Sequence, residues 1–245
     1  IIEDKYMIRL ITLFLTVLLC QNAFSLGKVH NVYPFATGTP LMAYNQINSM
    51  FEGPMGKYMG TAYLYIHLFD GMNPATHGLV IEHSDMESYQ TTLDALLGGE
   101  KKDPAAAMAF YMSQKEGIIN PIASLQHEVL MSVNPENWSK NKYLLVFDMA
   151  VKHPEKYAKA WKKLMDKTKK YNLSGSAVLA ANIAGGGPVT HVVAISSNSY
   201  AELMDTMDKT FSSDIYKEFQ TSVGDNRTVF NRSAYQRLGK WSQKD

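Results

Sequence analysis

Short stretches in which apolar and polar residues alternate recur along the chain, and stretches with helical spacing separate them. A period of two is typical of strands with one buried face, and a spacing of three or four is typical of amphipathic helices. In the first half, these patterns predict the order strand, helix, strand, strand, helix, strand. The expected strands are residues 29–35, 61–69, 76–83 and 122–132.

The second half repeats this order, and its helices begin with the same signals. Pro40 and Pro154 each stand in a predicted first helical turn, where the missing N–H of proline costs nothing. Ser84 and Ser199 are each followed three residues later by a glutamate, which predicts a capping box at the start of the second helix. The expected strands of this half are residues 143–151, 176–183, 190–196 and 228–238.

The two halves also share residues in a common register. Residues 74–81 and 188–195 have Pro, Thr, His and Ile at matching positions, at an offset of 114 (188 minus 74). The same offset relates two further pairs, Pro40 with Pro154 and Val32 with Val146. Because an internal repeat indicates repeated structure, the sequence predicts two copies of one module, residues 26–135 and 136–245.

Each predicted module has the βαββαβ order of a ferredoxin-like fold, in which helices cover one sheet face and leave the other bare. A bare apolar face is costly in water, so two modules in one chain are expected to close their bare faces into a barrel. In this respect the chain resembles the dimeric α/β-barrel superfamily in a tandem, single-chain form. Its members include antibiotic-biosynthesis monooxygenases, NIPSNAP, EthD-like and muconolactone-isomerase-like proteins, and haem proteins related to chlorite dismutase.

That resemblance rests on element order and repetition, without a diagnostic motif. It implies an α+β fold, with two tandem ferredoxin-like modules forming a pseudo-dimeric α/β barrel after a signal peptide. Function does not follow from such a likeness, because one fold hosts many activities.

Residues 1–25 have the features of a signal peptide preceded by a short remnant, residues 1–6. Translation is expected to start at Met7, and Arg9, the apolar run 10–20 and the small-x-small site ending at Ser25 follow. The run is too short to cross about 30 Å of hydrocarbon as a helix, although a membrane anchor or a buried helix is the alternative. We expect cleavage after Ser25 and a periplasmic or secreted protein.

The single cysteine, Cys20, lies within this segment, so the mature chain is expected to contain none. Disulfides, thiol nucleophiles and cysteine-bound metals are then excluded. The formal net charge of +1 gives no general electrostatic support for binding nucleic acid or anionic membranes. The seven histidines show no metal-binding spacing, so neither a metal site nor a cofactor is expected. Haem held by one axial histidine stays open as an alternative.

Candidate site residues come from the second and third strands of the first module. Alternation places Tyr63, Tyr65 and His67 on the face that should look into the barrel, and Glu82 follows on the neighbouring strand. Tyr63 and Tyr65 are predicted to bind a small ligand, and His67 and Glu82 to act as catalytic general bases tuned by burial. The alternative is that all four pack the interface between the modules.

The second module is expected to be the less polar of the two. Its matching inward positions are predicted to be Ala177, Leu179, Ala181 and Ile183, with Ser196 in the place of Glu82. His77 and His191 recur in both modules directly after a turn, so they are predicted to be structural and to bond the turn backbone.

These features predict an exported small-molecule-binding protein, with a cofactor-independent monooxygenase or isomerase as the possible chemistry. The alternatives are a non-catalytic binding or assembly module and a haem-binding protein. The expected partner is a small molecule, with no nucleic acid and no membrane after signal cleavage. The protein is expected to be a monomeric pseudo-dimer or a homodimer.

Overall fold

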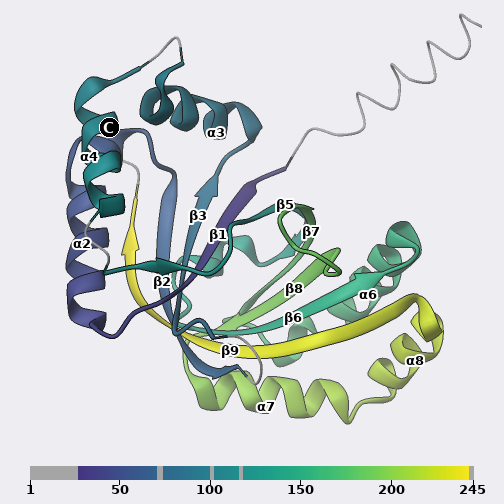
Figure 1. Cartoon of the computed structure of the whole chain (residues 1–245). Helices are drawn as coiled ribbons and strands as arrows, with labels where there is room; N and C mark the ends of the chain where they lie inside the picture. The colour runs from purple at the N-terminus through teal and green to yellow at the C-terminus, as the bar shows by residue number, and fades with distance from the viewer. Residues whose placement is uncertain (1–26, 71–73, 100–101, 116–117, 243–245) are drawn as a thin grey trace, which may run out of the picture.

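The structure is a computed structural model that describes residues 27–70, 74–99, 102–115 and 118–242. In these residues, eight antiparallel strands close into a barrel and seven α-helices surround it (Figure 1). The predicted signal peptide lies outside the described residues. None of the helices described is long and apolar enough to span a membrane.

The barrel confirms the expected α+β class. Its strands follow one another in the order β3-β2-β9-β6-β8-β7-β5-β1, and β1 pairs with β3 to close the ring. A short strand, β4, pairs with the C-terminal end of β1, at Phe35 and Ala36. The strands are β1 (Val29–Ala36), β2 (Thr61–Asp70), β3 (His77–His83), β4 (Asn120–Pro121), β5 (Leu125–Val133), β6 (Tyr143–Val151), β7 (Ser176–Ala184), β8 (His191–Ser197) and β9 (Arg227–Trp241).

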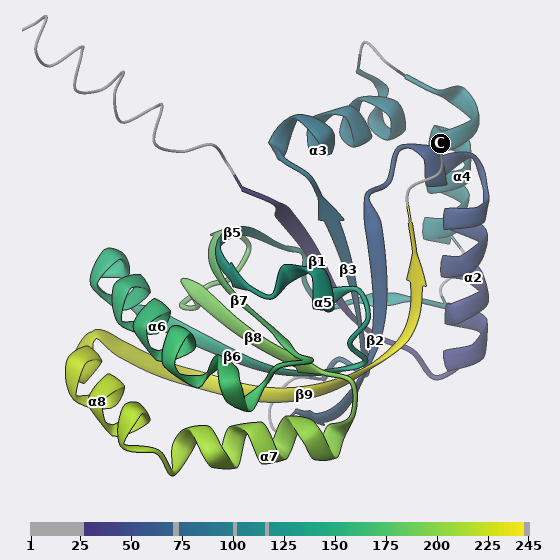
Figure 2. The same ribbon diagram turned by 180° about the vertical axis from the view of Figure 1, so that it is seen from behind.

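The two halves of the barrel have the same strand order. It is β5-β1-β3-β2 in the first half and β9-β6-β8-β7 in the second, and the halves join through β2–β9 and β5–β7 pairs. Strand β9 is shared, because residues 227–236 pair with β6 and residues 233–241 pair with β2. In Figure 2 this strand, drawn in yellow, curves from the second half into the first.

The helices lie outside the barrel in two groups (Figure 1). Pro40 and Pro154 occupy first helical turns, as predicted. Helix α3 continues into a π-helical turn at Asp94–Gly98. The first group is α2 (Pro40–Glu52), α3 (Met86–Leu93) and α4 (Pro104–Lys115), the second is α6 (Pro154–Thr168), α7 (Tyr200–Phe211) and α8 (Asp214–Val223), and α5 (Pro135–Trp138) lies in the connection between the halves.

One helix start differs from the prediction. Ser199 caps α7 as expected, because its hydroxyl accepts the Glu202 N–H at 3.1 Å. In α3 the cap is Asp85 rather than Ser84, and its carboxylate accepts the Ser88 N–H at 2.7 Å. A carboxylate binds a helical N–H more strongly than a hydroxyl does, so the capping position moves by one residue.

The repeated Thr-His pair has the same structural role in both halves. Thr76 Oγ1 lies 2.8 Å from His77 Nδ1 and accepts the Thr37 N–H. Thr190 Oγ1 lies 2.9 Å from His191 Nδ1 and accepts the Val151 N–H. Each imidazole therefore bonds the preceding threonine instead of the turn backbone, and each threonine ties its strand to the end of the neighbouring one.

Strand β2 has the predicted alternation. Ala62 and Leu64 belong to the core beneath the helices of the first half, whereas Tyr63 and Tyr65 form a separate cluster inside the barrel with Leu144. The aliphatic face thus packs under helices and the aromatic face looks inward.

The face prediction for β7 was wrong by one residue. Ala177 and Leu179 pack under the helices, and Val178 and Ala180 look into the barrel. The reason is the hairpin register, in which Tyr63 pairs with Val80 but Val178 pairs with the equivalent Ala194. The second hairpin is one residue shorter, so the side chains of β7 exchange faces relative to the predicted offset.

Candidate functional site

Among the pockets lined by the described residues, two bear on the candidate site: one inside the barrel and one beneath the helices of the first half. The barrel chamber has a volume of about 140 Å³. The helix-side cavity is larger, about 470 Å³. The residues predicted from the sequence lie in or beside the smaller space.

Both halves line the barrel chamber with polar and apolar side chains. The first half and α5 contribute His30, Tyr65, His67, His127 and Trp138, together with the apolar Val32, Pro34, Val80 and Leu125. The second half contributes mainly Leu144, Val146, Val178, Ala180, Val192 and Ala194, together with Asp148 and Tyr235. At the barrel chamber the first half is therefore more polar than the second, as predicted. The β7 residues that line it are Val178 and Ala180, not the predicted ones.

His67 lies against an aromatic ring and above a glycine. Its ring centre is 4.5 Å from that of Tyr235, with the ring planes nearly perpendicular. A Cβ placed on Gly78 would lie 3.7 Å from His67 Nε2. The imidazole therefore lies at van der Waals distance over Gly78 on the neighbouring strand.

The two tyrosines of β2 differ in their access to the chamber. Tyr65 lines it, whereas Tyr63 packs beside it, with the two ring centres 6.4 Å apart. Burial raises the pKa of Tyr65 well above its usual range. Burial also raises the pKa of Tyr63, to about 12, with a smaller contribution from the charge of Glu82. Both phenols stay protonated near neutral pH and can donate hydrogen bonds.

The Glu82 carboxylate is stabilised in its ionised form by two basic side chains. Its carboxylate lies 2.6 Å from Lys28 Nζ and 3.2 Å from His30 Nε2. Burial on its own would raise the pKa of Glu82, but His30 and Lys28 outweigh it and lower the pKa to about 2. This direction is opposite to the rise toward neutral pH that a general base needs.

Two histidines of the chamber were not singled out from the sequence. His30 pairs in register with Glu82 on β3 and with His127 on β5, so three titratable side chains form a row across the barrel. Burial, followed by repulsion from His30, lowers the pKa of His127 to about 4. The alternation of β1 could have shown that His30 looks inward, but its partners depend on strand pairing.

The helix-side cavity lies between the outer face of β1 and β3 and helices α2, α3 and α4. Most of its lining is aliphatic or aromatic, and the polar side chains are Tyr33, His83, Tyr89, Thr92, Ser113 and Ser124. The ring centres of His83 and Tyr89 are 5.3 Å apart. Burial, aided by repulsion from His30, lowers the pKa of His83 to about 4, so this imidazole is neutral.

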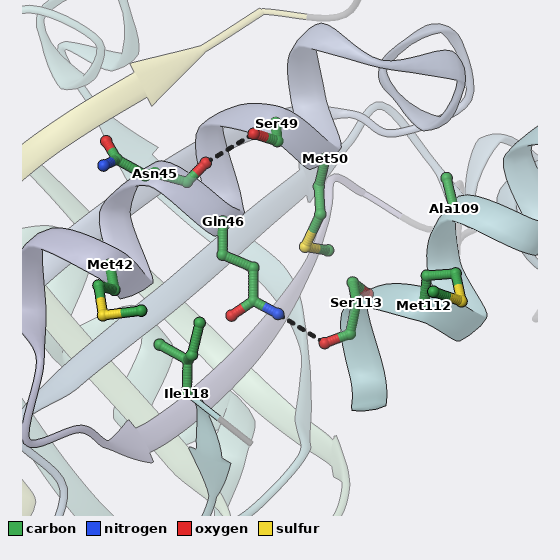
Figure 3. A pocket seen from close by; sticks show the side chains of 9 residues that line it. All are labelled: Met42, Asn45, Gln46, Ser49, Met50, Ala109, Met112, Ser113 and Ile118. Atoms are coloured by element: carbon green, nitrogen blue, oxygen red, sulfur yellow. Dashed lines mark hydrogen bonds between the residues drawn. The ribbon is translucent and has the colours of Figure 1, made fainter. Parts of the chain in front are cut away.

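A surface groove adjoins this cavity on the side of α2 and α4. Figure 3 shows Gln46 on α2 reaching Ser113 on α4, and its Nε2 donates to the Ser113 carbonyl at 2.6 Å. Met50 and Ser113 line both the groove and the cavity. Exposed Met42 and Met112 lie along the groove, and flexible methionines suit a variable apolar opening.

The described side chains that line these spaces are poorly suited to bind a metal ion or a haem. No group of three His, Cys, Asp or Glu side chains that could hold a metal occurs in the described residues. The described lining of the helix-side cavity offers a haem one imidazole, His83, and no cationic side chain for its carboxylates. Pockets for drug-sized ligands begin at roughly 300 Å³. The barrel chamber is smaller than this, so it is too small for a haem. The residues present do not fit a haem.

No protein-family model matches the chain, and no curated protein matches it. Several solved structures are similar in fold. A proposed monooxygenase from Fusobacterium nucleatum superposes with a TM-score of 0.58 at 14% identity, covering 90% of this chain and 96% of that one. An anthrone oxidase-like protein gives 0.55 at 12% identity, covering 89% and 94%.

A haem-binding protein from Thermus thermophilus is also similar, with a TM-score of 0.50 at 10% identity over 87% of this chain and 92% of that one. Identities this low show the fold alone. The chain therefore has the α+β fold of the dimeric α/β-barrel proteins, with a closed eight-stranded barrel.

Proposed function

We propose that this chain is an exported small-molecule-binding protein of the dimeric α/β-barrel type, which binds its ligand in the helix-side cavity. One observation carries the proposal. A space of about 470 Å³, within the range of ligand pockets, is lined mainly by apolar side chains and a few hydrogen-bonding groups.

The second half supports this interpretation by contrast. Its helices pack on the same face of their sheet, but the hollows there measure only about 40 and 30 Å³. Trp161 and Phe219 belong to the core of that half. The fold can therefore fill this space, and the first half leaves it open.

The polar groups of the cavity define the ligand. Burial raises the pKa of Tyr33 to about 12, so its phenol stays a hydrogen-bond donor, and His83 is neutral. In the described part of the chain, no hydrogen bond reaches the hydroxyl of Tyr33 or Tyr89. Burying an unpaired charge beside such groups is costly. The cavity thus suits an uncharged, largely apolar molecule with a carbonyl oxygen that accepts hydrogen bonds.

The same groups suit a cofactor-independent oxygenation. His83 is unprotonated and can accept a proton from a carbon acid, but its lowered pKa makes it a weaker base than a free imidazole. Tyr33 and Tyr89 donate to the carbonyl oxygen as it gains negative charge. The resulting carbanion reacts with dioxygen. Similarity in fold to a proposed monooxygenase and to an anthrone oxidase-like protein is consistent with this chemistry.

Anthrone is a suitable probe, because it is an uncharged aromatic ketone with an acidic methylene group. With one dioxygen it would give anthraquinone and water, which absorbance can follow. We expect saturable binding that Leu93→Trp abolishes by filling the cavity. We expect His83→Gln to bind anthrone but to lose most of its turnover. Binding that survives Leu93→Trp, with the protein folded, would refute the site.

A non-catalytic binding or assembly module is the second candidate. The small volume of the barrel chamber favours it for Tyr63, Tyr65 and His67, because these side chains pack against residues of the second half. Glu82 contacts Lys28 and His30 within the first half. Anthrone binding without turnover in the wild-type chain would select this alternative. A shifted Soret band on adding haemin would instead select the haem alternative.

We also infer that the chain is a tandem of two ferredoxin-like modules, residues 26–135 and 136–245. The common strand order and the matched Thr-His contacts support this. Each module covers the inner sheet face of the other, so a monomeric pseudo-dimer suffices for stability. Export to the periplasm or the cell exterior rests on the pattern of residues 1–25.

A further inference from the structure

The helix-side cavity is long and narrow rather than round. Phe35 on β1 and His83 on β3 both line it. In the register of these two strands, Phe35 is level with His77, which stands six residues before His83. At about 3.3 Å per residue, the two lining residues lie about 20 Å apart along the sheet. The cavity therefore follows β1 and β3 for most of their length.

The volume of the cavity suits an extended molecule. About 470 Å³ spread over about 20 Å leaves a mean cross-section of about 24 Å². This is comparable to the width of one extended hydrocarbon chain, or of a flat ring system entering on edge. A three-ring molecule such as anthrone is shorter than the cavity, so part of the space remains when it binds.

The free hydrogen-bonding groups lie together toward one end. The ring centres of His83 and Tyr89 are 5.3 Å apart. Burial, and then the charge of Tyr89, raises the pKa of Tyr33 to about 12, so the second phenol lies close to the first. These side chains form a polar group near the end of the cavity where β3 leads into α3 (Figure 1).

The opposite end of the cavity is mainly apolar. Pro121 pairs with Phe35 at the end of β1, so the segment around it closes this end. Its lining residues are Ile119, Pro121, Ile122 and Ala123, followed by Ser124, which is exposed. Water among these apolar side chains would find few hydrogen-bond partners, and an empty space would forfeit packing contacts. This end therefore requires an apolar occupant.

We propose that the ligand of the helix-side cavity is an extended amphiphile, with an uncharged carbonyl head and a linear hydrocarbon tail of about twelve carbons. The inference rests on the proposed function, because it takes the same cavity and specifies the class of molecule. The carbonyl accepts hydrogen bonds from Tyr33 and Tyr89, and the tail runs along β1 and β3 to Phe35. Each C–C bond of about 1.5 Å advances an extended chain by about 1.3 Å, so about twelve carbons span most of the cavity.

The probes are methyl ketones of increasing length, namely 2-hexanone, 2-nonanone, 2-dodecanone and 2-pentadecanone, titrated into the full chain by calorimetry. Because each added methylene group leaves water for an apolar wall, affinity should rise about threefold to fourfold per carbon as far as 2-dodecanone. It should level off between 2-dodecanone and 2-pentadecanone, because the last carbons extend beyond the cavity.

Substitutions at the apolar end test the position of the tail. Ala123→Trp fills this end and should weaken 2-dodecanone binding about tenfold or more, while 2-hexanone binding stays unchanged. Ile119→Trp does the same if the first variant does not fold. Asn120→Trp is the matched control, because this exposed residue lies between the other two without lining the cavity. It should change the affinity of neither ketone.

A substitution at the polar end tests the position of the head. Tyr89→Phe removes one hydrogen-bond donor, so it should weaken the binding of every ketone by a similar factor, about two- to tenfold. The rise in affinity with each added carbon should persist in this variant, since the tail contacts are unchanged.

The proposal is refuted if affinity does not rise from 2-hexanone to 2-dodecanone. It is also refuted if Ala123→Trp and Ile119→Trp both fold and still bind 2-dodecanone as the wild type does. Anthrone separates this failure from a failure of the proposed function. If anthrone binds and Leu93→Trp abolishes that binding, the cavity is a ligand site and only the linear tail is wrong. If neither anthrone nor any ketone binds, both proposals fail.

Discussion

His30 and Glu82 face each other across β1 and β3, with imidazole Nε2 3.2 Å from carboxylate Oε2. The other carboxylate oxygen lies 2.6 Å from Lys28 Nζ, and His127 flanks His30 on the opposite side. The carboxylate therefore carries a negative charge that two neighbours share. Protonation of these side chains at acid pH should therefore lower the free energy of unfolding of the whole protein.

Stability should fall as the pH drops from neutral toward 4. His83 and His127 have a folded-state pKa of about 4, below the ordinary value of 6.5, because burial disfavours their charged forms. The unfolded chain therefore binds protons first, and the free energy of unfolding decreases between about pH 6.5 and 4. Glu82, with a folded pKa of about 2, extends the loss from about pH 4.5 down to 2.

Guanidinium unfolding at several pH values measures this slope. One pKa unit corresponds to about 1.4 kcal/mol, so the two histidines together can account for several kcal/mol. The double variant His83→Gln/His127→Gln should lose much of the slope between about pH 6.5 and 4. An unchanged slope in this variant would contradict the assignment.

Trp241 should contribute strongly to stability, because it comes from the last strand and packs in the core of the first half. Its indole N–H donates to Asn48 Oδ1 at 2.9 Å, and its ring stacks on Phe51 with centres 5.5 Å apart. Trp241→Ala should lower the free energy of unfolding by about 3–5 kcal/mol. Trp241→Phe keeps a ring and should cost less. Equilibrium denaturation followed by circular dichroism measures both.

Asn48→Ala provides the matched control for the hydrogen bond alone. It leaves the indole N–H without its partner and should cost about 1–3 kcal/mol. If Asn48→Ala and Trp241→Phe have additive effects, the two residues do not act through this bond.

The two Thr-His pairs should respond alike to substitution. Thr76→Val and Thr190→Val each remove a hydroxyl that accepts a backbone N–H and contacts an imidazole. We expect each variant to lose about 1–3 kcal/mol, since buried polar partners are left unpaired. Thermal denaturation of both variants tests this. A large loss in one half and none in the other would show that the shared motif has unequal roles.

The N-terminal segment can be tested by mass spectrometry of the secreted or periplasmic protein. Expression with residues 7–245 should give a mature chain that begins at Leu26, because cleavage is expected after Ser25. The mature protein should not react with thiol reagents, since Cys20 is removed. Replacing Ala23 and Ser25 by bulky residues should block cleavage. A thiol-reactive mature protein would disprove it.

The strand pattern could be predicted from sequence wherever alternation is strong. In β2, aliphatic and aromatic residues alternate so regularly that the inward face of Tyr63 and Tyr65 followed directly. In β7 nearly every residue is small and apolar, so alternation does not show which side chains face the inside of the barrel. The prediction relied instead on the offset of 114 residues between the two halves. The second hairpin is one residue shorter than the first, and this reversed the faces.

The site was only partly accessible to the same reasoning. His67 was found because it shares a strand face with two tyrosines, but His30 and His127 lie about a hundred residues apart and meet through strand pairing. The helix-side cavity depends on how closely α3 and α4 approach the sheet, a tertiary property that local pattern does not encode. Tyr33 and His83 were therefore not recognised as site residues.

Strand β9, the last element of the chain, supplies a hydrogen-bonded neighbour to β6 and another to β2. During synthesis, the first half can form its sheet β5-β1-β3-β2 early, but the second half and the closed barrel must wait for residues 227–241. The ring of strands can therefore close only when the last strand has been made.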